Sequence, residues 1–156
     1  MTPEAAQGAT STTLYPMEAR ISGGMLALVR FLMTLQNKRM PVARFTVGRD
    51  RDALRITLLL DCPPEQARRY TELLAGLEDV EGIQSSADTM EVALLKTRGD
   101  GWRETTAAGV EVHEEGGTVV ASGEPGALEA WLAGIGDNVE DLVRLGPVAR
   151  PGNGGD

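Results

Sequence analysis

The sequence has little cysteine, few aromatic residues and no motif of a common enzyme site. Of its 156 residues only Cys62 is a cysteine and 4% are aromatic, whereas 42% are hydrophobic. A single cysteine excludes an internal disulfide framework and is compatible with a reducing compartment. Aliphatic residues and methionine must therefore fill the core. An acidic chain without an aromatic platform is also a poor candidate for binding nucleic acid.

Catalytic and metal-binding signals are equally scarce. His113 is the only histidine and lies in a predicted hairpin beside two glutamates, with no nucleophile signalled nearby, so we interpret it as a surface residue. Cys62 has no second cysteine with which to form a redox or metal pair. No zinc-protease helix, calcium loop or phosphate loop is present. We therefore expect no catalytic residue, no metal site and no cofactor bound by this chain.

Both ends of the chain are weakly patterned. The start, MTPEAAQGATSTT, lacks the basic and apolar regions of a secretory signal, and we interpret residues 1–13 as a disordered tail. The last six residues, PGNGGD, are interpreted as a second disordered tail, 151–156. Without a signal peptide or a membrane span, the sequence predicts a cytoplasmic protein.

The net charge of −8 is unevenly distributed along the chain. Residues 20–69 contain ten Lys or Arg against four Asp or Glu, whereas residues 70–156 contain five against seventeen. This polarity either orients the two halves or a partner, or reflects two independently solvated surfaces.

Hydrophobic periodicity in the first half predicts the order β-α-β-β-α-β, which is ferredoxin-like. A strand is predicted at 14–21, although Pro16 suits an edge strand or the beginning of a strand. Ser22 is a candidate N-cap for a helix from Met25 that ends before Pro41. Strands near 43–47 and at 54–61, a helix opened by two prolines, and a strand at 80–84 complete the unit. One apolar stripe is predicted on the first helix: Met25, Leu26, Leu28, Val29, Leu32, Met33 and Leu35.

The second half repeats the later part of this pattern. MEVALLK predicts a strand, residues 109–123 a hairpin, EPGALEAWLAGI a helix and VEDLVRLG a final strand. Between Lys96 and Gly109 the connection is too short and glycine-rich for more than a turn or two of helix. The expected fold is therefore α+β, with a complete unit at 14–86 and a truncated ββαβ unit at 87–150.

The elbow between the first strand and helix is a candidate ligand site. Gly23 and Gly24 precede free backbone amides at a helix N-terminus, where an anionic group such as an amino-acid carboxylate can be held. The alternative is that the two glycines only make a tight turn.

The order of these segments resembles the ACT domain of acetolactate (acetohydroxyacid) synthase small subunits. The stretch GGMLALVRFLMTLQNKRMPVARFTVG, followed by LRITLLLD and LEDVEGIQ, is similar to that family's Asn-x-x-Gly-x-Leu elbow, helix, Leu-Thr-Val strand, Arg-Ile-Thr strand and Leu-x-x-Val-x-x-Val. The likeness continues in MEVALLK, SGEPGALEAWLAGI and VEDLVRLGPVA, and covers most of residues 14–150. The matching ACT-domain residues are Gly24, Leu26, Thr46, Val47, Arg55, Ile56, Thr57, Leu77, Asp79 and Val80.

This resemblance implies a non-catalytic regulatory subunit with an ACT domain at 14–86 and a C-terminal small-subunit domain at 87–150. Such a subunit activates a thiamine-diphosphate-dependent catalytic subunit of branched-chain amino acid synthesis. Thiamine diphosphate, Mg and FAD are expected only on that catalytic partner. The family also implies a homodimer through the ACT domains, with feedback by an amino acid, usually valine, bound between them. The effector then acts by population shift.

The chain departs from the family where the effector binds. One asparagine of the family aligns with Ile21, or with Arg20 in a register shifted by one, and the other aligns with Pro41. Neither Ile nor Pro supplies an amide side chain, and losing two hydrogen-bonding partners costs on the order of a few kcal/mol of binding. We therefore predict weakened, absent or altered valine binding. The predicted site comprises Ile21, Ser22, Gly23, Gly24, Met25, Leu26, Pro41 and Val42.

Two other functions stay open from the sequence. One is a stand-alone ACT-type sensor that binds a small molecule between two protomers. The other is a degenerate scaffold that only dimerises or stabilises a partner.

Overall fold

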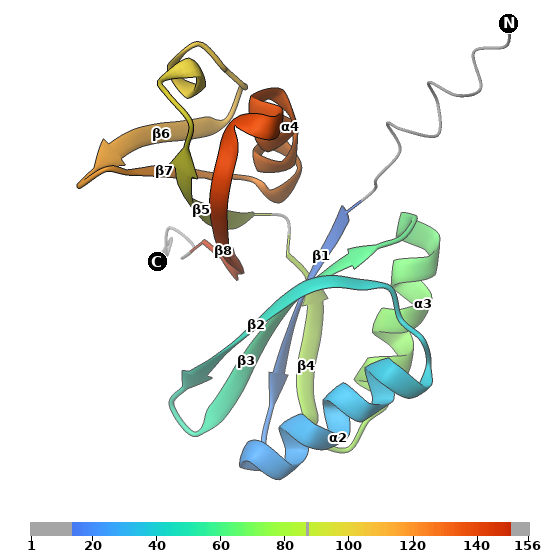
Figure 1. The fold of residues 1–156 in the computed structure, drawn as a ribbon. Coiled ribbons are helices and arrows are strands. Elements are labelled where there is room, and N and C mark those ends of the chain that lie inside the picture. The colour runs from blue at the N-terminus through green and yellow to red at the C-terminus, as the bar shows by residue number, and fades with distance from the viewer. Residues whose placement is uncertain (1–13, 87, 151–156) are drawn as a thin grey trace, which may run out of the picture. The chain divides into compact units, whose positions relative to one another are not determined.

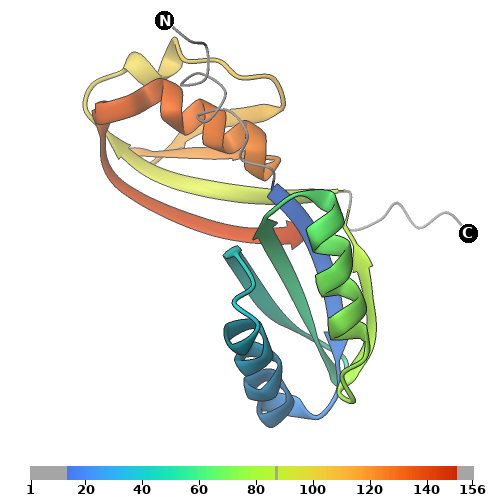
Figure 2. The same cartoon turned by 90° about the vertical axis from the view of Figure 1, so that its right-hand side faces the viewer.

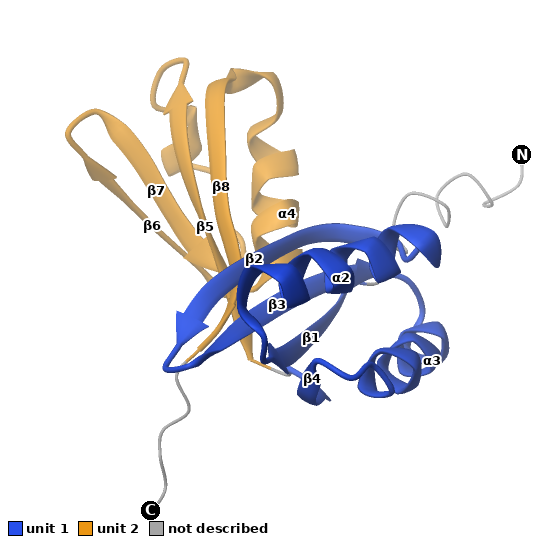
Figure 3. Ribbon diagram, turned by 90° about the horizontal axis from the view of Figure 1, so that it is seen from below, with its two compact units in different colours: residues 1–86 blue, residues 87–156 orange. Residues whose placement is uncertain are grey.

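Alternating hydrophobic residues form two four-stranded antiparallel sheets, one in each half of the chain (Figure 1). The computed structural model describes residues 14–86 and 88–150, and the tails predicted at 1–13 and 151–156 lie outside these ranges. The chain divides into unit 1, residues 1–86, and unit 2, residues 87–156 (Figure 3). The predicted α+β fold with two ferredoxin-like units, the second one truncated, is confirmed.

Unit 1 has the ferredoxin-like order. Its sheet is arranged β2-β3-β1-β4, so each crossover helix connects two strands across a third and lies on the same face of the sheet (Figure 3). Among residues 14–86, no helix lies on the second face. The elements are β1 (Leu14–Ile21), α2 (Gly24–Asn37), β2 (Val42–Asp50), β3 (Ala53–Asp61), α3 (Pro64–Ala75) and β4 (Val80–Ser85).

The core of unit 1 lies between the sheet and these helices. Met17 and Ala19 of β1 lie opposite Leu58 and Ile56 of β3, and all four side chains are buried. This pairing follows from the period-2 alternation of apolar residues in both strands. The helices contribute Ala27, Leu28, Phe31 and Leu35 from α2 and Ala67 and Leu74 from α3.

Pro16 does not mark an edge strand. β1 lies between β3 and β4 in the centre of the sheet, so the edge-strand alternative is wrong, whereas Pro16 does lie near the beginning of its strand, as the other alternative predicts. The pairing of β1 with β4 begins at Met17, and the Pro16 carbonyl accepts a hydrogen bond from Ser86 N–H (3.1 Å). Pro16 therefore lies just before the first residue of β1 that pairs with β4. Its missing N–H removes no hydrogen bond of that strand pair.

Only one side of the apolar stripe of α2 is buried. Met25, Leu26, Val29 and Met33 are 69%, 64%, 48% and 56% exposed, and we call these four residues the α2 flank. A helix packed on one sheet needs an apolar stripe on one face, and the stripe of α2 is wider than that. Four large apolar side chains on one helix are thus left without cover in this chain.

Unit 2 repeats the topology of unit 1 with one helix missing. Its sheet order, β6-β7-β5-β8, corresponds strand by strand to β2-β3-β1-β4. A single 3-10 turn, Gly101–Arg103, replaces the first crossover helix, and α4 covers one face of the sheet (Figure 2). The other elements are β5 (Thr89–Thr97), β6 (Val110–Glu115), β7 (Thr118–Gly123), α4 (Pro125–Ile135), a second 3-10 turn (Gly136–Asn138) and β8 (Val139–Ala149).

An ion-pair network crosses the core of unit 2. Glu91 of β5 is fully buried, and its Oε2 accepts a hydrogen bond from Arg144 Nε of β8 (3.2 Å). Arg144 also pairs through Nη1 with Glu129 of α4. One mostly buried guanidinium thus links two strands and the helix that covers them.

Replacing Arg144 by methionine should therefore destabilise unit 2 by about 3 kcal/mol, because a buried carboxylate loses its cationic partner. Both tryptophans lie in this unit, so intrinsic fluorescence in urea follows its unfolding. The control is Arg98→Met, because Arg98 pairs at 3.6 Å with Glu140 and both side chains are exposed. That change should alter stability by about 0.5 kcal/mol or less. Equal effects of the two substitutions would contradict the role of the buried pair.

Candidate functional site

The elbow between β1 and α2 is built by two glycines in the left-handed region. Gly23 has a φ of 101° and Gly24 a φ of 67°, values that side-chain-bearing residues rarely adopt. The prediction that Ser22 caps the helix is wrong, because Gly23 is the N-cap and no side chain caps α2. The first-turn N–H groups therefore have no side-chain acceptor. A positive helix end without a side-chain cap is the feature expected of an anion-binding elbow.

The two sides of the elbow differ in how much room they leave. A Cβ atom added to Gly23 would lie 3.0 Å from the Ala27 Cβ and 3.6 Å from Asp79 Oδ1. A Cβ atom added to Gly24 would have no atom within 4 Å. The elbow is therefore closed toward Asp79 and open beside Gly24.

Asp79 fixes the closed side. Its carbonyl accepts a hydrogen bond from Ser22 N–H (2.9 Å), which explains why Ser22 is held before the helix. Its carboxylate accepts from Arg30 Nε (2.8 Å) and Nη2 (3.0 Å). The hydrogen bonds from Arg30 lower the pKa of Asp79, and the same bonds raise the pKa of Arg30. Asp79, the residue immediately before β4, thus holds the elbow through its backbone carbonyl. It holds the first turns of α2 through its side chain.

A small cavity of about 200 Å³ lies beside this ion pair. Ala27, Phe31 and Thr34 of α2 and residues 77–80 line it together with Arg30. Its volume is below the range of about 300–1,000 Å³ that is usual for small-molecule pockets. None of the eight predicted site residues lines it, so this cavity is not the predicted effector site.

The structure places the predicted site residues in two separate groups. Ile21 is fully buried in the core, so only its backbone faces the elbow, whereas Met25 and Leu26 are exposed next to Gly24. Pro41 and Val42 are partly buried and follow the opposite end of α2. Helical residues 27–37 lie between the two groups and separate them by about 17 Å along α2. Within one chain, residues 21–26 and residues 41–42 do not form a single site.

The fold that carries this elbow also occurs in a protein of known structure. The chain is similar to an acetolactate synthase small subunit from Thermotoga maritima, with a TM-score of 0.65 and 14% identity, over 87% of this chain and 95% of that one. Identity this low shows a shared fold, which spans both units. An unknown protein from Galdieria sulphuraria overlaps less well, with a TM-score of 0.39 and 11% identity over 84% of this chain and 96% of that one.

Sequence comparisons give no further relative. No protein-family model matches the chain, and no curated protein gives a significant match. Among residues 14–86 and 88–150, no group of three or more His, Cys, Asp or Glu side chains is placed to hold a metal ion. In the same ranges no helix is long and apolar enough to cross a membrane.

The Asp79–Arg30 ion pair that holds the first turns of α2 should depend on pH. The folded-state pKa of Asp79 is lowered from 3.8, so its stabilising contribution is present above pH 3.8 and is lost as pH falls through the lower folded value. Asp79→Asn should therefore lower the urea midpoint of unit 1 at pH 7, and the difference from the parent protein should shrink below pH 3.8. Circular dichroism in urea, at pH 7 and at a pH below 3.8, measures the urea midpoints of the variant and the parent protein.

The control for this experiment is Asp52→Asn. The Asp52 side chain is 96% exposed and lies 3.6 Å from the Arg20 guanidinium, so its removal should change little at either pH. An Asp79→Asn difference that stays constant down to acidic pH would show that the ion pair is not the source of the effect.

Proposed function

We propose that this chain is a non-catalytic regulatory subunit that activates a thiamine-diphosphate-dependent, acetolactate synthase-type catalytic subunit. The observation that carries the proposal is the fold shared with an acetolactate synthase small subunit over both units and nearly the whole chain. The similarity of segments 23–48, 54–61 and 77–84 to that family supports it independently. Thiamine diphosphate, Mg and FAD belong to the catalytic partner in this proposal.

The homodimer of this proposal forms along α2 and the edge strand β2. Phe45 and Val47 of β2 are 44% and 37% exposed and lie opposite Leu58 and Ile56, hence on the helix-bearing face of the sheet. Since α2 crosses over β3 to reach β2, the α2 flank and these two residues form one apolar edge. A second copy covers this edge when two β2 strands pair antiparallel about a two-fold axis.

This dimer unites the divided effector site. The two-fold axis is perpendicular to the paired β2 strands, so the two α2 helices beside it also run antiparallel. The elbow of one protomer therefore approaches Pro41 and Val42 of its partner. The amino acid then binds between protomers and stabilises one arrangement of their interface, which is how it would regulate the complex.

Feedback by valine is weakened or altered in this proposal. The Ile21 side chain is buried in the core and Pro41 has no N–H to donate, so neither replaces an asparagine of the family. Only the backbone amides of Gly24–Leu26 and the apolar side chains around them remain to hold the ligand.

A charge placed on the α2 flank should abolish the dimer. Val29→Glu and Met33→Glu each put a carboxylate into the proposed apolar interface, which is strongly unfavourable without a partner. Sedimentation velocity should show a dimer for the parent protein and a monomer for both variants. The matched control is Leu73→Glu on α3, where an apolar side chain that is 37% exposed lies away from this edge. If Val29→Glu and Met33→Glu remain dimeric, the interface lies elsewhere.

Reconstitution tests the proposed function directly. The purified chain is added to an acetolactate synthase-type catalytic subunit loaded with thiamine diphosphate, Mg and FAD, and acetolactate formation is measured with and without valine, leucine or isoleucine. We expect a higher kcat on addition of the chain and little inhibition by valine. No stimulation, together with calorimetric binding of an amino acid, would favour the stand-alone sensor. A dimer that neither stimulates nor binds would favour the scaffold.

A further inference from the structure

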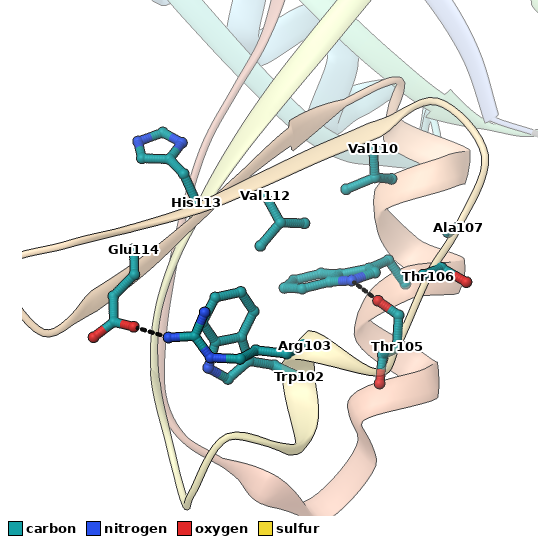
Figure 4. Close-up of a pocket in the computed structure, with 10 residues that line it drawn as sticks. Trp102, Arg103, Thr105, Thr106, Ala107, Val110, Val112, His113 and Glu114 are labelled. Atoms are coloured by element: carbon teal, nitrogen blue, oxygen red, sulfur yellow. Dashed lines mark hydrogen bonds and ion pairs between the residues drawn. The ribbon is translucent and has the colours of Figure 1, made fainter.

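The missing crossover helix leaves a hollow on the sheet of unit 2. It has a volume of about 460 Å³, within the range of ligand pockets (Figure 4). Its apolar lining comes from Val110 and Val112 of β6, Ala107, and the chain's two tryptophans, Trp102 and Trp131. Strand β6 corresponds to β2, beside which α2 lies in unit 1. The hollow therefore lies where a second helix would cover this sheet.

The tryptophans present carbon surfaces to this hollow. Trp102 is 7% exposed and Trp131 is 1% exposed, so Trp102 offers a small part of its ring and Trp131 forms the floor with almost no exposed surface. The Trp131 Nε1–H donates to the Thr105 carbonyl (3.0 Å) and is not available to a ligand. An apolar side chain is the group that these surfaces accommodate.

One wall of the hollow is an ion pair that solvent reaches. Arg103 Nη2 lies 2.7 Å from Glu114 Oε2, and their side chains are 56% and 41% exposed. The guanidinium also lies 4.5 Å from the centroid of Trp102. In Figure 4 Glu114 points toward Arg103, whereas the His113 ring points away from the pair. Because exposed ion pairs contribute little, a ligand can separate these two groups at low cost.

Neighbouring charges of opposite sign select the class of ligand. A simple anion attracted by Arg103 is repelled by Glu114 and by Asp100, whose carboxylate lies 3.8 Å from Arg103. A simple cation attracted by Glu114 is repelled by Arg103. An α-amino acid carries a carboxylate and an ammonium next to each other, and so satisfies both charges at once.

We propose that this hollow binds a free α-amino acid with an apolar side chain. The ligand carboxylate accepts hydrogen bonds from Arg103, the ligand ammonium donates to Glu114, and the side chain lies against Trp102, Trp131 and Val112. The site uses unit 2 alone and is separate from the elbow of unit 1. It holds whether or not the chain regulates an acetolactate synthase.

Tryptophan fluorescence tests this site selectively, since both tryptophans of the chain line it. The full chain is titrated with L-leucine and L-phenylalanine to millimolar concentration. N-acetyl-L-leucine, which lacks the ammonium, and L-leucinamide, which lacks the carboxylate, are titrated alongside. We expect a saturable change in emission with both amino acids and at least about tenfold weaker binding of both leucine derivatives.

Substitutions of the two charged residues test the role of each in binding the amino acid. Glu114→Gln and Arg103→Gln should each weaken leucine binding about tenfold or more, whereas Glu111→Gln, on the same strand but outside the lining of the hollow, should leave it unchanged. Circular dichroism confirms that each variant is folded. No saturable change with either amino acid overturns the proposal, as does equal binding of leucine and its two derivatives. Calorimetric heat without a change in tryptophan emission also overturns it, because binding then occurs away from the two tryptophans.

Discussion

Each sheet of this chain must bury one face, and the two units meet that requirement with different numbers of helices. In unit 1 two crossover helices cover the face completely enough that Met17, Ala19, Ile56 and Leu58 are fully or almost fully buried. Among residues 88–150 of unit 2, α4 is the only α-helix, and Trp102 on a 3-10 turn fills part of the place of the missing first crossover helix. The hollow beside Trp131 results from this incomplete cover. Apolar surface that the helices of a sheet leave uncovered is available for binding.

The secondary structure and topology of the two units were predictable because the sequence signals for them are local. The bounds of β1 follow from alternating apolar residues, and the missing helix of unit 2 follows from the short glycine-rich segment after β5. A strand that alternates in period 2 has only one way to bury its apolar face. The topology then follows, because few connections link such elements without crossing.

Features that depend on distant residues were not predictable. The Ser22 N–H bonds to the Asp79 carbonyl, a partner far away in the sequence, so Gly23 rather than Ser22 caps α2. The presence of Pro16 in a central strand depends on where β4 stops pairing. Periodicity identified the apolar residues of α2. The residues of the sheet that pack against the helix decide which side of its wide apolar stripe is buried. The split of the candidate site between the two ends of α2 also required the structure, since proximity to a helix in sequence does not imply proximity in space.

The repeated topology gives the chain two equivalent edge strands with opposite chemistry. Strand β2 has Phe45 and Val47 on its helix-bearing face, whereas the corresponding strand β6 has exposed Glu111, Glu114 and Glu115. Carboxylates brought opposite one another across a strand pair repel, so two β6 strands cannot pair in the way proposed for two β2 strands. In the proposed dimer, pairing through β2 therefore closes after two subunits, because growth into a filament would also need β6 to pair with a second β6.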